Sequence, residues 1–173
     1  ADTSGKPETA SRGYRLELSP AEEGPPLLTV FGGKITSYRQ LAEKAVNLLA
    51  ERGSRIGDKA WTGASSLPGG DFPVGGLADL TADLARRYPF LAARDARRIA
   101  KAYGTDASQW LGEARSWADL GGHYGAGLSP AEVEWMTTRE WAASSEDILW
   151  RRSKLGLVLD EAGRGRLAAD LKE

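Results

Sequence analysis

The hydrophobic pattern of the first third of the chain changes from strand-like to helical. Tyr14, Leu16 and Leu18 alternate with charged residues, which is the period of a strand with one solvated face. The apolar run 27–31 follows a loop rich in Pro, Glu and Gly and predicts a second strand, buried on both faces, that can pair with the first. From 37 to 52 apolar residues recur at helical spacing. The pattern therefore predicts a β-β-α unit.

Beyond residue 76 the apolar positions keep a helical spacing almost to the end of the chain. The clearest helix start is Ser129-Pro130-Ala131-Glu132, a capping box with proline at the first helical position. In the predicted 106–114 helix, Asp106 is the expected N-cap. The pattern predicts successive helices over 77–88, 94–103, 106–114, 130–142, 144–152 and 160–171.

These patterns predict a mainly α fold, in which a β-β-α unit precedes a bundle of about six helices. Residues 1–55 hold a polar tail and the β-β-α unit. Residues 56–76 are rich in Gly, Ser, Pro and Asp and form a linker or a long ordered loop. Residues 77–173 form an all-α domain.

Composition narrows the classes of function. The 23 basic and 24 acidic residues leave a net charge of −1, so no overall field draws the molecule to nucleic acid. The absence of cysteine excludes thiolate metal sites, and a single histidine speaks against a zinc centre. The sequence contains no run of about 20 apolar residues, so it does not predict a membrane span. Because the chain begins with Ala1 and not with methionine, we expect a fragment.

Between the second predicted strand and the first helix lies the pair Gly32-Gly33. Glycines lack a Cβ, so the main chain can approach a ligand closely, and the first N–H groups of a helix carry partial positive charge. Lys34 and Thr36 add a cation and a hydroxyl at the same corner. The corner suits an anion or an electron-rich ring, but a tight turn without any ligand explains the local pattern as well.

Two other motifs invite a functional interpretation and do not support one. "GRGRLA" at 163–168 matches a dinucleotide-binding spacing but has no room for a βαβ unit, so we interpret it as part of a helix start. His123 lies in a glycine-rich loop without an acidic or second histidine neighbour, and we interpret it as structural or exposed. No catalytic residue and no metal ligand is assigned.

The basic and aromatic residues of the predicted helices have ordinary structural interpretations. The basic groups over 94–101 and 151–154 could dock anions, yet a solvated helix face is the simpler interpretation. Four tryptophans fall on predicted helices, where core anchoring is the expected role: Trp110, Trp135, Trp141 and Trp150.

Several long motifs occur in an order that resembles a known family. "LLTVFGGKITSYRQLAEKAVNLL" is followed by "LPGGDF", then "ARRIAKAYGT", then "GAGLSPAEVEWMTTREWAASSEDILWRRSKLGL". This series resembles the closing segment and C-terminal helical domain of the FAD-dependent, aerobic sn-glycerol-3-phosphate dehydrogenases. The resemblance covers nearly everything from about 12 to 158.

The resemblance implies a role for the glycine corner and a context for the chain. By analogy, Gly32, Gly33, Lys34 and Thr36 contact the flavin or the active site, with substrate contact as the alternative for Lys34. The upstream FAD-binding domain would hold the catalytic base and the FAD itself. The intact protein would oxidise glycerol 3-phosphate to dihydroxyacetone phosphate and pass electrons to quinone, as a cytoplasmic protein at the inner face of the membrane.

Two alternatives from other classes remain open. The chain could be a self-contained helical interaction module, or a nucleic-acid-binding domain that uses the basic face over 94–101. If the chain is a fragment, residues 1–55 lack their natural sheet. We then expect them to be poorly ordered, rearranged or paired with another copy in a homo-oligomer, because uncovered apolar faces seek partners.

Overall fold

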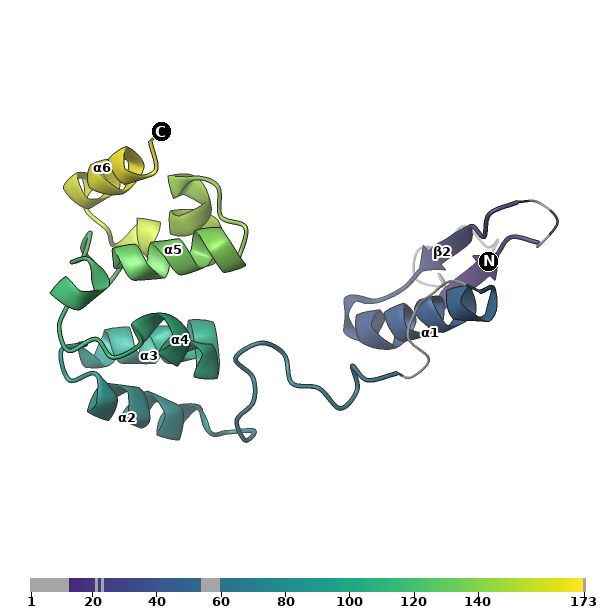
Figure 1. The fold of residues 1–173 in the computed structure, drawn as a ribbon, viewed down its shortest axis with the longest axis horizontal. Coiled ribbons are helices and arrows are strands. Elements are labelled where there is room, and N and C mark those ends of the chain that lie inside the picture. Colours follow the sequence, from purple (N-terminus) through teal and green to yellow (C-terminus); the bar gives the residue numbers. More distant parts are fainter. Residues whose placement is uncertain (1–12, 21, 23, 54–59, 173) are drawn as a thin grey trace, which may run out of the picture. The chain divides into compact units, whose positions relative to one another are not determined.

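The chain forms two compact units, Ala1–Ser65 and Ser66–Glu173. The computed structural model describes residues 13–20, 22, 24–53 and 60–172, and Figure 1 shows the course of the chain. The predicted polar tail, 1–12, lies outside the described residues. Each unit is considered by itself below.

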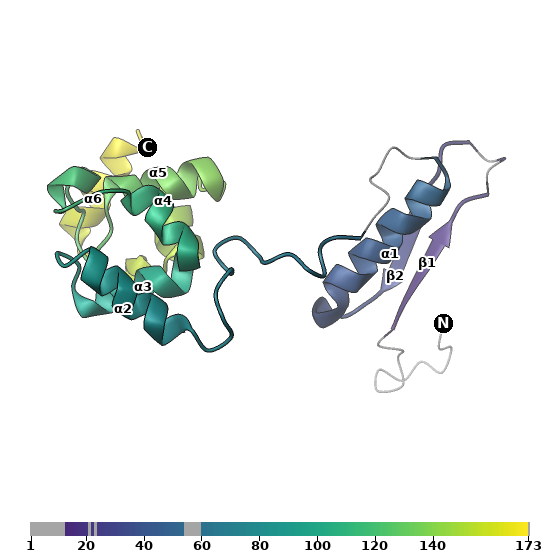
Figure 2. The same cartoon turned by 60° about the horizontal axis from the view of Figure 1, so that its bottom comes forward.

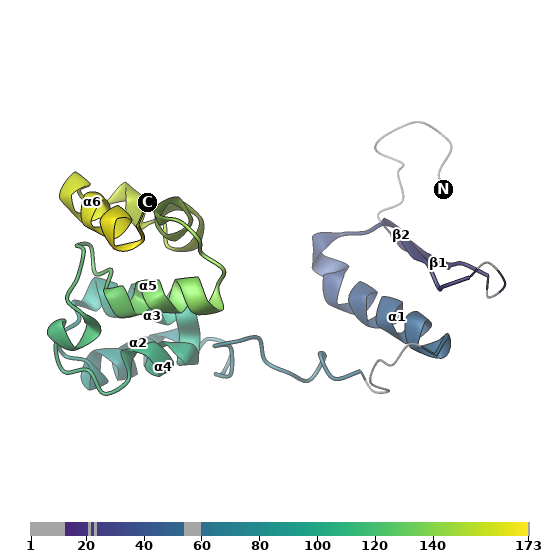
Figure 3. The same ribbon diagram turned by 45° about the horizontal axis from the view of Figure 1, so that its top comes forward.

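The first unit contains the predicted β-β-α order. Strand β1 (Tyr14–Leu18) and strand β2 (Leu28–Gly32) pair in antiparallel register, with Tyr14 opposite Gly32. A 3₁₀ turn, η3 (Ile35–Ser37), leads into helix α1 (Tyr38–Glu51), which lies along the hairpin in Figures 2 and 3. Along β1 the apolar residues are half-buried and the charged ones exposed, so the predicted alternation is confirmed.

The prediction that the second strand is buried on both faces is wrong for this chain. None of the residues of β2 is buried, and Val30 and Phe31 are 45% and 44% exposed. A single helix covers a single face of the two-stranded sheet. On the strand face that carries Phe31, the guanidinium of Arg15 lies 4.9 Å from the centre of the phenyl ring.

The first unit has regular structure without a buried core. We expected poor order, rearrangement or pairing with another copy; the described part of the segment forms a regular hairpin and helix, and pairing stays a prediction. None of its described residues is buried. Its large exposed apolar side chains are Leu27, Val30, Phe31, Ile35, Tyr38, Val46 and Trp61. The unit therefore presents apolar surface of the kind that drives association.

The second unit is helical, which confirms the predicted mainly α fold. Its α-helices are α2 (Leu77–Arg87), α3 (Ala93–Tyr103), α4 (Ala107–Leu111), α5 (Pro130–Arg139) and α6 (Glu161–Asp170). Four shorter elements connect them: η4 (Gly104–Asp106), η5 (Ala118–Leu120), the π-helix η6 (Asp147–Arg152) and η7 (Leu155–Leu157). Figures 1 and 3 show α3 lying between α2 and α5.

One core connects these helices. Its largest fully buried side chains come from every part of the unit, and they include Tyr88, Ile99, Leu111, Leu128, Met136, Ile148 and Leu167. On α3 the buried positions are spaced by one helical turn, and this is the stripe that the sequence pattern predicts. The helical unit has the buried core that the first unit lacks.

Two helices differ from their predicted form. Helix α4 ends at Leu111 because Gly112 has φ +53°, a left-handed conformation that suits glycine. Asp106 is not its side-chain cap, since its carboxylate accepts from the side chain of Gln109 at 2.7 Å. The predicted 144–152 helix is a π-helix at its centre, where the N–H of Ser153 reaches the carbonyl of Ile148 at 3.0 Å.

From Ser66 onward, the segment predicted as a linker or ordered loop belongs to the helical unit. The N–H of Thr105 donates to the carbonyl of Gly69 at 3.0 Å. A Cβ on Gly69 would lie 2.0 Å from the carbonyl oxygen of Tyr103, and one on Gly104 would lie 1.8 Å from that of Gly69. The two backbones touch where both residues are glycine, and this contact fixes the loop against the end of α3.

The tryptophans divide between core and surface. Trp110 and Trp135 pack against the core and are partly buried, as predicted. Trp141 lies beyond the end of α5 with φ +59° and is 88% exposed, and Trp150 is 38% exposed. The expectation of core anchoring is therefore wrong for Trp141, because the helix that would have turned it inward ends at Arg139.

A fully buried carboxylate joins α3 to α5. The Oγ of Ser129 accepts from the N–H of Glu132 at 3.2 Å, which confirms Ser129 as the cap of α5. The carboxylate of Glu132 points inward, where it accepts from both terminal nitrogens of Arg98 at 2.6 and 2.7 Å. The hydroxyl of Tyr103 donates to it at 2.6 Å. Of the predicted capping box, Ser129 thus acts as the cap, whereas the side chain of Glu132 pairs with Arg98.

This pairing changes the interpretation of the basic residues on α3. Arg98 was grouped with a solvated face, but its side chain is only 19% exposed and also donates to the carbonyl of Gly127 at 2.8 Å. Burial by itself would lower the pKa of Arg98, and the hydrogen bonds and charge of Glu132 raise it above its ordinary value. Burial and the same carboxylate raise the pKa of Tyr103. Arg98 is therefore charged and Tyr103 neutral near neutral pH.

We expect Arg98→Met to destabilise the chain strongly. The substitution leaves the Glu132 carboxylate buried without a cation, which typically costs about 3–5 kcal/mol. Arg97→Met is the matched control, because Arg97 is the exposed neighbour on the same helix and should change the free energy of unfolding by less than about 0.5 kcal/mol. Urea unfolding followed by circular dichroism measures both values. Equal losses in the two variants would contradict the role given to the buried pair.

Candidate functional site

The glycine corner of the first unit is a sharp turn between β2 and η3. Gly32 has φ +71° and Gly33 has φ +116°, conformations that other residues seldom adopt. A Cβ on Gly32 would lie 3.0 Å from the carbonyl oxygen of Gly13, and one on Gly33 would lie 3.3 Å from a methyl of Leu41. Backbone conformation and internal packing thus account for both glycines without a ligand.

The outer side of this corner carries the groups that could meet a ligand. Lys34 and Thr36 are exposed, as are both glycines, so the structure brings the four predicted residues together on one rim. The carbonyl of Lys34 accepts from the N–H and the hydroxyl of Ser37 at 3.0 and 2.9 Å, and this starts the helical turn. The ammonium of Lys34 has no ion-pair partner among the residues the structure describes.

The chemistry of this rim fits one edge of a flavin site. Helix starts direct N–H groups outward with partial positive charge, and Lys34 adds a full charge beside them. Negative charge on the pyrimidine side of a flavin ring would be stabilised by such a set. The corner offers only an edge of such a site, because no buried, unpartnered polar side chain of the described residues lies at it.

The other sequence candidates have structural roles. The ring of His123 packs edge-on against that of Trp117, with centres 5.4 Å apart. The "GRGRLA" motif lies within α6, where a Cβ on Gly163 would lie 2.4 Å from the carbonyl of Tyr124, so this glycine allows close packing. Within the described residues no three His, Asp or Glu side chains form a group that could hold a metal. No helix among them has the length and apolarity of a membrane span.

The buried trio of Arg98, Tyr103 and Glu132 is the polar feature that sequence reasoning missed. The positions themselves gave one signal: Glu132 follows a serine cap and a proline, and it precedes an apolar helix face. Nothing in the linear pattern pairs it with Arg98, which is 34 residues away. The two terminal nitrogens of Arg98 and the hydroxyl of Tyr103 are bonded within the chain, and in this trio only the buried Nε of Arg98 lacks a partner among the described residues. We therefore assign the trio to stability.

The chain thus consists of a β-β-α unit with an exposed cationic corner and an all-α unit that follows it. The sequence profile of the C-terminal domain of alpha-glycerophosphate oxidase matches residues 60–169. The chain belongs to this family. The match covers the helical unit from its first residue to 169, and the resemblance predicted from the motifs is confirmed.

Curated relatives extend the similarity through the first unit. The chain is 44% identical to a glycerol-3-phosphate dehydrogenase of Pseudomonas aeruginosa, over 99% of this chain and 33% of the relative. It is 40% identical to the aerobic glycerol-3-phosphate dehydrogenase of Escherichia coli, over 99% and 34%. A D-erythritol 1-phosphate dehydrogenase of Brucella abortus is 36% identical, over 94% and 32%. The chain spans about a third of the length of these relatives.

We expect Gly33→Ala to loosen the corner more than Gly24→Ala. Both glycines have φ above +100°, so both substitutions meet a similar backbone strain. Only Gly33 also has a neighbour, Leu41, in the way of a new Cβ. The extra contact should cost about 1 kcal/mol and raise amide exchange in α1 about fivefold relative to the control. Equal exchange in the two variants would show that Leu41 yields freely.

Proposed function

We propose that this chain is part of a flavoprotein that oxidises sn-glycerol 3-phosphate to dihydroxyacetone phosphate. Its membership of the family and its similarity to two glycerol-3-phosphate dehydrogenases along nearly its whole length support this proposal. The similarity to a D-erythritol 1-phosphate dehydrogenase is lower, so glycerol 3-phosphate is the preferred substrate over a longer polyol phosphate.

The glycine corner is the part of this chain to which we assign contact with FAD. FAD held there would supply an acceptor for the hydride from C2 of the substrate and a carrier of two electrons for a quinone. Gly32 and Gly33 let the main chain come close on the outer side of the corner. The start of η3 and the hydroxyl of Thr36 would face the ring edge, and Lys34 would offset negative charge there or hold the substrate phosphate. We assign no catalytic base to the described residues of this chain.

We further propose a division of labour within the longer protein. An upstream FAD-binding domain would hold most of the cofactor and the catalytic base, while the helical unit braces or docks. A quinone acceptor would bring the protein to a membrane surface, because quinones reside in the bilayer. We propose the inner face of the membrane and a cytoplasmic protein. The alternative, a self-contained interaction module, draws support from the separate core of the helical unit.

A hybrid enzyme tests the proposal. The C-terminal third of the Pseudomonas aeruginosa relative is replaced by this chain, and FAD content and glycerol-3-phosphate-dependent reduction of a quinone analogue are measured. Lys34→Ala should lower kcat/KM about a hundredfold, the usual loss for one preorganised donor or cation. Lys101→Ala, also an exposed lysine without an ion pair in the described residues, should stay within about twofold.

The hybrid also separates the rival functions. A folded hybrid that holds FAD but does not oxidise glycerol 3-phosphate would contradict the proposed substrate. Equal activity of the Lys34→Ala and Lys101→Ala hybrids would show that the glycine corner is not part of the active site. Activity on D-erythritol 1-phosphate alone would indicate that the chain is part of a D-erythritol 1-phosphate dehydrogenase.

The chain by itself is expected to be inactive and not to hold FAD tightly. One edge of a site, without an enclosing pocket, cannot bury the large surface that a tightly bound cofactor requires. Purified chain should therefore be colourless and should show no saturable change in flavin fluorescence at micromolar FAD. A yellow, stoichiometric complex would overturn this expectation.

A further inference from the structure

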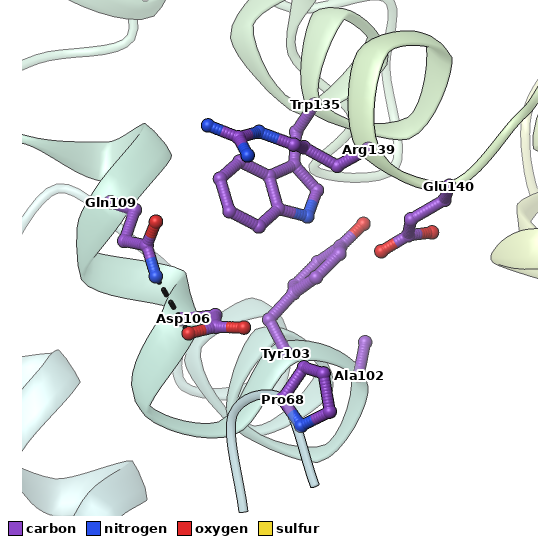
Figure 4. Close-up of a pocket in the computed structure, with 8 residues that line it drawn as sticks. All are labelled: Pro68, Ala102, Tyr103, Asp106, Gln109, Trp135, Arg139 and Glu140. Atoms are coloured by element: carbon purple, nitrogen blue, oxygen red, sulfur yellow. Dashed lines mark hydrogen bonds between the residues drawn. The ribbon is translucent and has the colours of Figure 1, made fainter. Parts of the chain in front are cut away.

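A pocket of about 340 Å³ opens in the helical unit between the end of α3, α4 and the end of α5. Figure 4 shows two aromatic rings, Tyr103 and Trp135, facing into it from α3 and α5. The polar and aromatic side chains of its lining are those of Tyr103, Asp106, Gln109, Trp135, Arg139 and Glu140. The volume is in the range of a site for a small organic molecule.

The charges of this pocket are not paired with one another. Asp106 and Glu140 lie on opposite sides of Tyr103 in Figure 4, and neither forms an ion pair within the part of the chain that the structure describes. Asp106 only accepts a hydrogen bond from Gln109 at 2.7 Å. The guanidinium of Arg139 lies over the ring of Trp135 at 5.6 Å and also lacks an ion pair there. The lining thus carries two negative charges and one positive charge.

Glu140 has less access to water than Arg139. Burial raises its pKa, against the opposing hydrogen bond from Trp135 and the charge of Arg152. Glu140 is half-buried and follows directly on the end of α5, whereas Arg139 is exposed. The long side chain of Arg139 can move into water at little cost, but the carboxylate of Glu140 cannot recover its lost hydration in this way.

These features decide between the classes of ligand. An anion would have to enter between two carboxylates, and a neutral molecule would strip further water from Glu140 without compensation. A cation would be attracted by both carboxylates and by the faces of two aromatic rings, which favour organic ammonium groups. We propose that this pocket binds an organic ammonium ion, with Glu140 and Asp106 as its counter-charges and Tyr103 and Trp135 as its walls.

The proposal is independent of the function proposed above, because none of the pocket residues belongs to the glycine corner. The ammonium group can come from a free alkylamine or from a lysine side chain of a polypeptide. The chemistry is the same in both cases, and the probes below distinguish the two sources.

The test is a titration of the 173-residue chain, at constant ionic strength, followed by the NMR signal of the Trp135 indole N–H. The probes are n-butylammonium, neutral n-butanol, butyrate and N-acetyl-lysine methylamide. The ammonium probes should saturate with a Kd on the order of millimolar, and butanol and butyrate should not. Tighter binding of the blocked lysine indicates a polypeptide source, and tighter binding of butylammonium indicates a free amine.

Three variants separate a cation site from an anion site. Glu140→Gln should weaken butylammonium binding about tenfold, because it removes a charge-assisted contact. Arg139→Met should strengthen it, since a competing cation is lost. Glu134→Gln, an exposed glutamate of α5 outside the pocket, should leave the Kd unchanged. Weaker binding in Arg139→Met, saturable binding of butyrate, or equal responses to butanol and butylammonium would each overturn the proposal.

Discussion

The helical unit is organised around the neutralisation of one buried carboxylate. Glu132 has no exposed surface, and an ionised carboxylate in that position is tolerable only with a cation and further donors around it. Arg98 and Tyr103 provide them from α3, and the carbonyl of Gly127 accepts from the same guanidinium. One charge therefore sets the position of α3, of α5 and of the loop that precedes α5.

The neighbouring glycine contact extends this constraint to the connecting segment. Tyr103 ends α3 with its hydroxyl on Glu132, and directly after it the backbone of Gly104 touches that of Gly69. The pocket proposed to bind an ammonium ion is thereby connected to the pair of Arg98 and Glu132, because Tyr103 forms one of its walls. The geometry of the pocket follows from packing that is itself fixed by electrostatics.

The two units illustrate different relations between folding and function. The helical unit buries a complete core and satisfies its strongest charges internally, so its groups serve stability except in the pocket beside α5. The first unit has regular strands and a helix but no buried residue among those described, and the groups that we propose to contact a cofactor are exposed at one corner. Such a unit contributes an edge to a site and depends on another surface to complete it.

The linear pattern determined the element types and the family. Period-two alternation predicted β1, and helical spacing predicted α1, α2, α3, α5 and α6, because amphipathic periodicity directly reflects which face is solvated. Long ordered motifs were enough to indicate the family. They also indicated Gly32, Gly33, Lys34 and Thr36, which the structure brings together on one rim.

Tertiary structure alone decided where side chains at predicted positions point. Glu132 was predicted as half of a local cap and is instead the buried partner of Arg98, since contacts between residues 34 positions apart leave no periodic trace in a single sequence. Trp141 was predicted inside and lies outside because α5 stops two residues before it. The second strand is exposed because burial on both faces requires neighbours, which no strand can supply for itself.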